Sequence, residues 1–240
     1  MPLTPTRVQM IVPKALYFDG IDDYVEVPDS PSLDITDAIT LEVLINAMSE
    51  QPNNYPKFIA KRNAYVLHTG QSYPNYIAFN IFSDGNLRQT FASYVLNADE
   101  WTYITATYDG RYGKIYVNVE LEKTRDFGSS GSIDVTGNDV GIGAYPDGST
   151  SYKGYIGFVR VYDRALTEDE IKWNYFNPDN PVRDGLVLWL HWDSIDIEAG
   201  KWYDKSGYGN DGTIYGAVEV EIIKSPTRVL SPTRVLPPTR

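Results

Sequence analysis

The sequence has no cysteine and only two histidines among its 240 residues. The lack of thiols excludes disulfide bonds, zinc–thiolate centres and cysteine nucleophiles, and His68 and His191 are too few for a histidine-rich metal centre. We therefore expect any bound metal to have oxygen ligands. No stretch approaches the ~18 consecutive apolar residues of a membrane-spanning helix, and residues 1–14 lack the apolar segment of a signal peptide. We expect no membrane insertion and find no export signal in this chain.

Basic residues are also scarce. The 21 Lys and Arg residues stand against 32 Asp and Glu residues, so the formal net charge is -11. Such a charge repels the phosphates of nucleic acids and of anionic lipids, and we expect no nucleic-acid partner. The hydrophobic fraction of 42% is nevertheless sufficient for a large core, which excludes a disordered acidic chain.

Composition and periodicity indicate an all-β fold. The 19 Tyr, 19 Gly and 15 Pro residues suit short strands joined by tight turns. Apolar and polar residues alternate over 76–82, 101–108 and 114–119, and Asp-Gly turns separate these runs. We predict a two-sheet antiparallel jelly-roll sandwich. Further strands are expected near 15–18, 23–27, 39–47, 57–61, 64–68, 87–95, 139–143, 153–162, 186–192 and 217–223.

One short helix is expected in this β fold. Thr167 and Glu170 have the spacing of a capping box, which satisfies free amide groups at a helix start. The helix should run to Tyr175, and Trp173 should dock it onto a sheet.

Related Pro-Thr-Arg phrases lie at both ends of the chain. Proline removes the backbone donors that a strand ladder needs, so residues 1–12 and 225–240 read as a linker arm and a repeat tail around a domain at 13–224. They are either connectors, edge-strand arms capable of self-association, or solvated tails.

Five phrases together resemble laminin G-like domains of the concanavalin A-like lectin/glucanase superfamily. They lie at Ala15–Pro28, Glu100–Ile104, Lys114–Asn118, Gly154–Ile171 and Asp204–Thr213. The resemblance implies the jelly-roll fold. In the family, the segment that resembles Gly185–Ala217 ordinarily precedes the Phe-Asp-Gly phrase, whereas here it comes last. The chain is therefore either circularly permuted or cut from a tandem array.

The superfamily includes glucanases, so the resemblance allows a catalytic function. Retaining glycosidases need two carboxylates about 5 Å apart, which the family's glucanases supply from an E-x-D-x-x-E strand. This chain has no such phrase, and it also lacks a G-x-S-x-G elbow and a phosphate-binding loop. We predict that the protein is not an enzyme, with a glycosidase as the less favoured alternative.

Two acidic, glycine-rich turns suit a calcium ion, which takes 6–8 oxygen ligands. The candidate ligands are Asp19, Asp22, Asp23, Asn210 and Asp211, and the resemblance implies that these turns lie together at one edge, where family members often hold a structural calcium. The alternative is that the same side chains only form Asx-turns.

Three loops combine tyrosines with amide and carboxylate groups, as sugar-binding sites do. The candidates are Asn54, Tyr55, Tyr73, Asn75, Tyr145, Asp147 and Tyr152, although any single tyrosine can instead be a packed rim residue. We predict a non-catalytic binding or adhesion module for a glycan or surface glycoprotein, located outside the cell or on a cell or virion surface. The alternative is a structural building block or decoration protein of a virus particle or cell-surface assembly.

Overall fold

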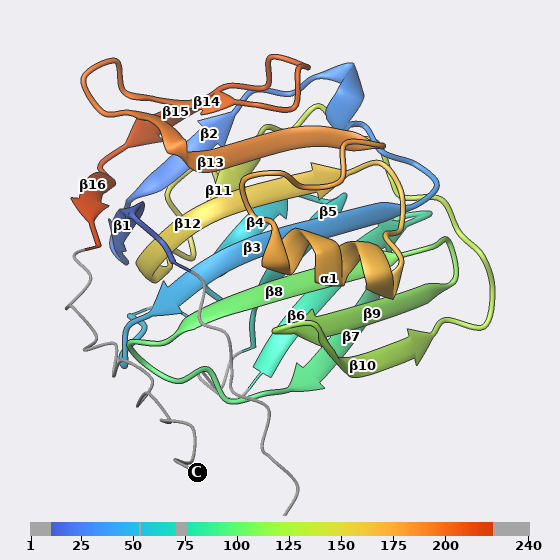
Figure 1. Ribbon diagram of the computed structural model, residues 1–240. Coiled ribbons are helices and arrows are strands. Elements are labelled where there is room, and N and C mark those ends of the chain that lie inside the picture. Colours follow the sequence, from blue (N-terminus) through green and yellow to red (C-terminus); the bar gives the residue numbers. More distant parts are fainter. Residues whose placement is uncertain (1–10, 53, 71–75, 223–240) are drawn as a thin grey trace, which may run out of the picture.

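The computed structural model describes residues 11–52, 54–70 and 76–222 (Figure 1). The strands are β1 (Lys14–Asp19), β2 (Tyr24–Val27), β3 (Ile39–Ala47), β4 (Lys57–Lys61), β5 (Tyr65–Thr69), β6 (Tyr76–Ser83), β7 (Asn86–Ser93), β8 (Trp101–Tyr108), β9 (Tyr112–Val117), β10 (Glu120–Asp126), β11 (Val140–Ile142), β12 (Lys153–Tyr162), β13 (Leu186–Asp196), β14 (Lys201–Asp204), β15 (Gly212–Tyr215) and β16 (Val218–Glu221). A 3₁₀ turn lies at Pro31–Leu33 and one α-helix, α1, at Glu168–Phe176.

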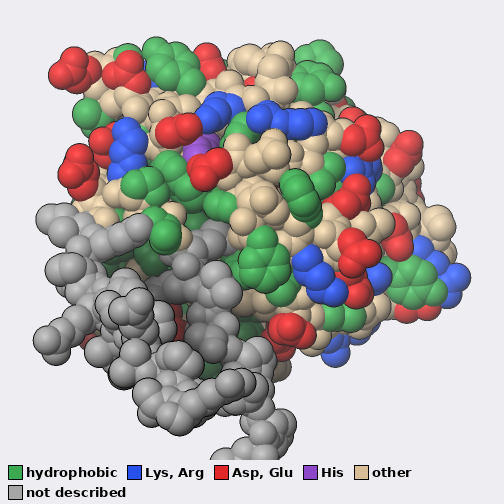
Figure 2. Space-filling view, in the orientation of Figure 1, with side chains coloured by type: hydrophobic (Ala, Val, Ile, Leu, Met, Phe, Trp, Pro, Cys, Tyr) green, Lys and Arg blue, Asp and Glu red, His purple; other side chains and the backbone are tan. Residues whose placement is uncertain are grey.

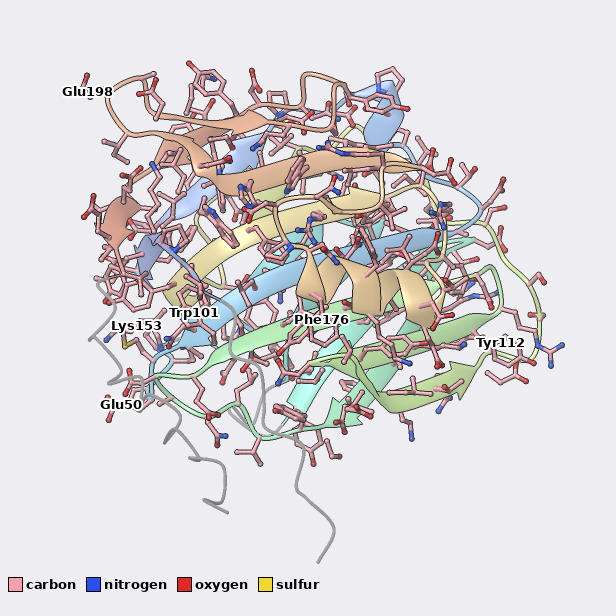
Figure 3. The ribbon with its side chains drawn as sticks, in the orientation of Figure 1. Glu50, Trp101, Tyr112, Lys153, Phe176 and Glu198 are labelled. Carbon is pink, nitrogen blue, oxygen red and sulfur yellow. The ribbon has the colours of Figure 1, made fainter. Side chains whose placement is uncertain are left out.

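The strands form the predicted antiparallel sandwich. The front layer in Figure 1 runs β10-β9-β8-β3-β12-β13, with β1 beside β12 and β16 beside β1. Hydrogen bonding continues from β13 through β14, β15, β2 and β11 into β4-β5-β6-β7, which form the layer behind. Glu50, Trp101 and Lys153 mark one end of the front layer, where β3 has ended and β8 and β12 begin (Figure 3).

Alternation along the strands builds the main core between the layers. Val43 and Ile104 point into it from the front layer, and Leu67 and Phe79 point into it from the back layer. All are at most 1% exposed. Because successive strand residues face opposite sides, the same strands present a second set of side chains on the outer faces.

α1 lies across the middle of the outer face of the front layer, in front of β3 and β8 (Figure 1). The predicted capping box is present, because the Thr167 side chain accepts from the Glu170 amide. The expectation for Trp173 is wrong, since this side chain is 50% exposed and its Nε1 donates to the Asn180 carbonyl. Ile171 and Tyr175 are buried instead and dock the helix.

A buried ion pair lies under α1. Glu42 on β3 bonds Arg160 on β12 at 2.9 Å, and both side chains are fully buried. Tyr103 donates to the same carboxylate, and Asn174 of α1 donates to both of its oxygens. A buried charge without such partners is strongly destabilising, so this network ties the helix to one position on the sheet.

The last strands return to the first ones. β16 pairs with β1 from Lys14↔Glu221 to Tyr17↔Val218, and the Ile222 amide donates to the Pro13 carbonyl at 2.8 Å. β15 likewise forms an antiparallel pair with β2, an early strand. The late segment therefore completes the sandwich within this one chain. Within the predicted arms, Val12 is buried in the cluster under α1 and Ile11 is 60% exposed, while residues 1–10 and 225–240 lie outside the described residues.

Charges are mixed on the face that carries α1, where Asp and Glu side chains lie between Lys and Arg side chains (Figure 2). No broad basic surface forms on this face. Within the described residues, no helix is long and apolar enough to span a bilayer.

Candidate functional site

The connection from β11 to β12 forms the rim of the candidate site. Gly148 adopts a positive φ of 74° and closes a tight turn, in which its amide donates to the Tyr145 carbonyl at 2.8 Å. The turn presents Asp147, which is exposed, and Tyr145, which is half-buried. The Lys57 amide donates to the Thr150 carbonyl and so fixes this loop beside the start of β4.

Two of the loops predicted to bind sugar lie together here. Lys57 Nζ is 5.7 Å from the centre of the Tyr55 ring and 5.4 Å from the centre of the Tyr145 ring. Asn54 is exposed beside Tyr55. Tyr73 and Asn75 lie outside the described residues.

The site contains a pocket of about 330 Å³. It is lined by Arg62, Gly137, Asn138, Asp139, Pro146 and Asp147. Arg62 bonds Asp147 at 2.7 Å, and its guanidinium lies 4.2 Å from the centre of the Tyr145 ring. The Ser149 hydroxyl donates to Asp147 and, with Arg62, lowers the pKa of that carboxyl.

Most residues of this pocket carry no signal in the sequence. Arg62 is in the short turn between β4 and β5, and Asn138 and Asp139 precede β11. Asn138 donates to the Arg62 carbonyl at 3.0 Å, which joins the two segments. None of these side chains belongs to a binding motif, and only the pairing of β11 with β4 brings them together.

Polar groups underlie the tyrosines. Burial, and next the neighbouring Arg62, lower the pKa of Lys57 to about 8. Its Nζ donates to the Tyr55 carbonyl at 2.6 Å. The His68 ring on β5 lies 6.0 Å from the Tyr55 ring in an edge-on arrangement. Tyr55 therefore stands above a buried cation and a buried imidazole.

The expectation that Tyr152 belongs to the sugar-binding loops is wrong. It is fully buried, and its ring packs edge-on against Phe58 at 5.3 Å in the main core. It follows the loop and directly precedes β12, so its side chain turns inward with the strand. The ring has no face to offer a ligand.

The first acidic turn brings Asp19, Asp22 and Asp23 together. One carboxylate oxygen from each lies within 4.8 Å of the others. Asp23 also accepts from the Asp19 amide at 2.8 Å. Burial raises the pKa of Asp23, and the nearby charges of Asp19 and Asp22 raise it further, while the amide bond opposes the shift. Three crowded carboxylates fit a hard cation.

The second acidic turn is elsewhere, which corrects the expected five-residue metal site. β2 and β15 are antiparallel with Tyr215 opposite Tyr24, so Gly216 lies beside Asp23 while Asn210 reaches Ser30 beyond the other end of β2. The strand rise of ~3.3 Å puts roughly 20 Å between the two turns. Asn210 and Asp211 cannot share an ion with Asp19, Asp22 and Asp23.

In the second turn, hydrogen bonds to backbone amides explain the presence of the acidic side chains. Asp204 accepts from the amides of Trp189, Ser206 and Asn210. Asp211 in turn accepts from the Asp204 amide at 2.8 Å. These are turn-forming roles for short polar side chains, in agreement with the Asx-turn alternative.

The first acidic turn and the pocket adjoin. A Cβ at Gly148 would lie 3.7 Å from Asp22 Cβ, and the Ser151 hydroxyl donates to the Ile21 carbonyl at 3.0 Å. The loop that carries Asp147 thus rests on the acidic turn.

Comparisons with solved structures show similar folds. A putative carbohydrate binding protein from Bacteroides ovatus has a TM-score of 0.70 at 24% identity, and the match covers 89% of this chain and 61% of that one. The botulinum neurotoxin serotype G binding domain has a TM-score of 0.56 at 14% identity, with 70% and 43% covered. The Ruminococcus gnavus sialidase module CBM40, bound to sialyllactose, has a TM-score of 0.53 at 18% identity, with 66% and 96% covered.

This chain thus spans about three fifths of the length of the Bacteroides protein. A search of curated proteins gave no match. A laminin G-like family model matches residues 19–172, from the acidic turn into α1. This match covers more than half of the chain, which therefore belongs to the concanavalin A-like lectin/glucanases superfamily.

Proposed function

We propose that the protein is a non-catalytic module that binds a glycan in the pocket between Arg62 and Asp147. The observation that carries this proposal is the pocket itself, in which fixed donors and acceptors stand beside the Tyr145 ring. Sugar-binding sites combine these features, because hydroxyls both donate and accept while the apolar face of the ring packs on an aromatic side chain. The cavity of about 330 Å³ is near the lower end of the usual 300–1,000 Å³ for ligand pockets, which suits one or two sugar units.

The pocket's carboxylates suit binding better than catalysis. A general acid needs a carboxyl whose pKa is raised towards neutrality, whereas the pKa of Asp147 is lowered. Asp139 accepts from the Asp29 amide at 2.7 Å and so holds the pocket wall. Both groups are placed as hydrogen-bond acceptors.

Two proteins of similar fold support this proposal. One is a putative carbohydrate binding protein, and another is a sialidase module bound to sialyllactose. Such a module would act outside the cell, or on a cell or virion surface.

The test is a glycan array followed by calorimetry with the best-bound glycan. Asp147→Asn and Tyr145→Ala should each weaken binding by about 1–3 kcal/mol. Asp147→Asn should also leave the melting temperature nearly unchanged, because its ion pair with Arg62 is solvent-exposed. Tyr208→Ala is the matched control, because Tyr208 is 58% exposed and lies in the Asp204–Asp211 turn. If wild-type protein binds no glycan and only self-associates, the structural alternative replaces this proposal.

We also propose that Asp19, Asp22 and Asp23 hold a structural calcium ion. The support is the crowding of three carboxylates and the raised pKa of Asp23. Calcium would neutralise this repulsion and stiffen the turn on which the Asp147 loop rests.

A further inference from the structure

The arginines of the described chain fall into two groups. Arg62, Arg111, Arg160 and Arg164 each pair with a carboxylate. Arg88, Arg125 and Arg183 do not, although acidic residues outnumber basic ones by 32 to 21. Arg183 instead donates to a backbone carbonyl and lies over the Trp189 ring. Arg88 and Arg125 line the same groove.

The groove lies between β7 and β10 and has a volume of about 390 Å³. It is lined by Leu87, Arg88, Gln89, Phe91, Arg125 and Phe127. Figure 1 shows β7 behind β9 and β10, and Tyr112, labelled in Figure 3, starts the β9 strand whose Gly113 pairs with Arg125. The groove is thus at the edge of the sandwich where the two layers meet.

Neutral groups hold Arg88 in place. Its Nη1 donates to the Ser129 carbonyl at 2.7 Å and to the Tyr108 hydroxyl at 3.3 Å. Its guanidinium lies 5.6 Å from the centre of the Phe127 ring. The cation is therefore oriented before any ligand arrives, and its charge is not neutralised.

Arg125 faces the same groove as an exposed side chain that has no hydrogen-bond or ion-pair partner in the described part of the chain. The neighbouring carboxylate is engaged elsewhere, because Asp126 forms two 2.8 Å bonds with Arg111. Successive strand residues point to opposite sides, which keeps Asp126 away from Arg125.

Two guanidinium groups without a counter-charge favour an anion between them. Arginine binds planar carboxylates with paired hydrogen bonds, which a lysine cannot do. Leu87 and Phe91 line the groove from the outward face of β7, where they are 51% and 44% exposed. A carboxylate attached to a ring with an apolar face fits both parts of the groove.

We propose that this groove binds the carboxylate of an acidic sugar, so that the glycan ligand is an acidic oligosaccharide. The inference rests on the proposed glycan-binding function. A row of side chains leads from the groove to the rim of the candidate site. Gln89, which lines the groove, donates to Asn80, and the Asn80 amide bonds His68. The His68 ring in turn faces Tyr55 at the rim. From β7 to β4 the strand spacing of ~4.8 Å gives roughly 14 Å, which a short oligosaccharide can span.

The test uses an array of oligosaccharides that carry uronic acid, sialic acid or sulfate, each beside a neutral counterpart, which is the methyl ester for the carboxylates. Wild-type protein should bind a carboxylate-bearing glycan better than its ester, and rising salt should weaken that binding. Arg125→Gln should lower this affinity about tenfold. Lys172→Gln is the control, because it removes one charge from an exposed position on α1.

Each other outcome is decisive. If esters bind as well as acids, or if only sulfated glycans bind, the carboxylate inference is overturned while the glycan-binding function stands. If Asp147→Asn weakens an acidic glycan and Arg125→Gln does not, the groove is not the site of the charge. If no glycan binds, the inference fails together with the function on which it rests.

Discussion

Mild acid should destabilise this fold through His68. The imidazole is only 3% exposed and is held as a neutral ring. Nδ1 donates to the Thr69 carbonyl, and Nε2 accepts from the Asn80 amide at 3.0 Å. Gln89 donates to the other end of that amide at 2.8 Å and fixes its orientation. A second proton on the ring would face a donor and find no acceptor.

The size of the effect follows from the pKa. Burial, and next the charge of Lys57, lower the pKa of His68 from 6.5 to about 4. As the pH falls, the imidazole of the unfolded chain takes up a proton before the buried one does. The stability that the neutral His68 contributes is therefore complete above pH 6.5 and is lost between pH 6.5 and about 4. At 1.36 kcal/mol per pH unit, the loss at pH 5 is about 2 kcal/mol.

Urea unfolding at pH 7, 6 and 5 would measure this loss. His68→Gln keeps an amide that can bond Thr69 and Asn80 but cannot titrate, so its stability should fall about 2 kcal/mol less than that of wild type between pH 7 and 5. The pKa of His191 is also lowered to about 4, mainly by burial, and His191→Gln measures that contribution separately. If wild type and His68→Gln lose the same stability over this range, the reasoning about His68 is refuted.

Three further outcomes are expected from melting and urea experiments. Millimolar calcium should raise the melting temperature by several degrees, since an ion at a hundredfold excess over Kd adds about 2.7 kcal/mol to the stability. Asp22→Ala should abolish this rise, whereas Asp211→Ala should preserve it. Superimposable melting curves with calcium and with chelator would contradict the calcium proposal. Asn174→Ala should cost about 2–3 kcal/mol, because Glu42 stays buried and loses a donor. Arg111→Gln should change stability little, because its ion pair is solvent-exposed, and a large loss there would contradict this view.

Some strands were predictable and others were not, for physical reasons. The alternation over 101–108 predicts a strand because Ile104 and Ala106 face the main core, while Tyr103 is buried on the opposite face. β10 was missed because all of Glu120–Asp126 is exposed, so no apolar row marks it. Charged side chains suit such an edge strand, since they discourage pairing with other molecules. The strands β14 and β15 were also missed; each has a single buried residue, Trp202 and Gly212 respectively.

The site was less predictable than the fold. Tyr55, Tyr145 and Asp147 were identified by residue type, and the structure places them at one rim. Arg62 was not identified, because a lone arginine in a turn carries no signal until β11 pairs with β4. The grouping of Asn210 with Asp22 failed because a sequence motif does not give the distance between two turns. The register of β2 and β15 determines that distance.

The meeting of β1 and β16 also determines how the domain would respond to pulling. Residues 13 and 222 are hydrogen-bonded neighbours at the same end of an antiparallel pair. A force applied through these two points would peel β16 from β1 one hydrogen bond at a time and would not shear the ladder all at once. The pair is short, and the rest of the sandwich would bear no load until it opened. A module anchored at both ends would therefore yield first at this seam, at low force, while the rim with Arg62 and Asp147 stayed folded.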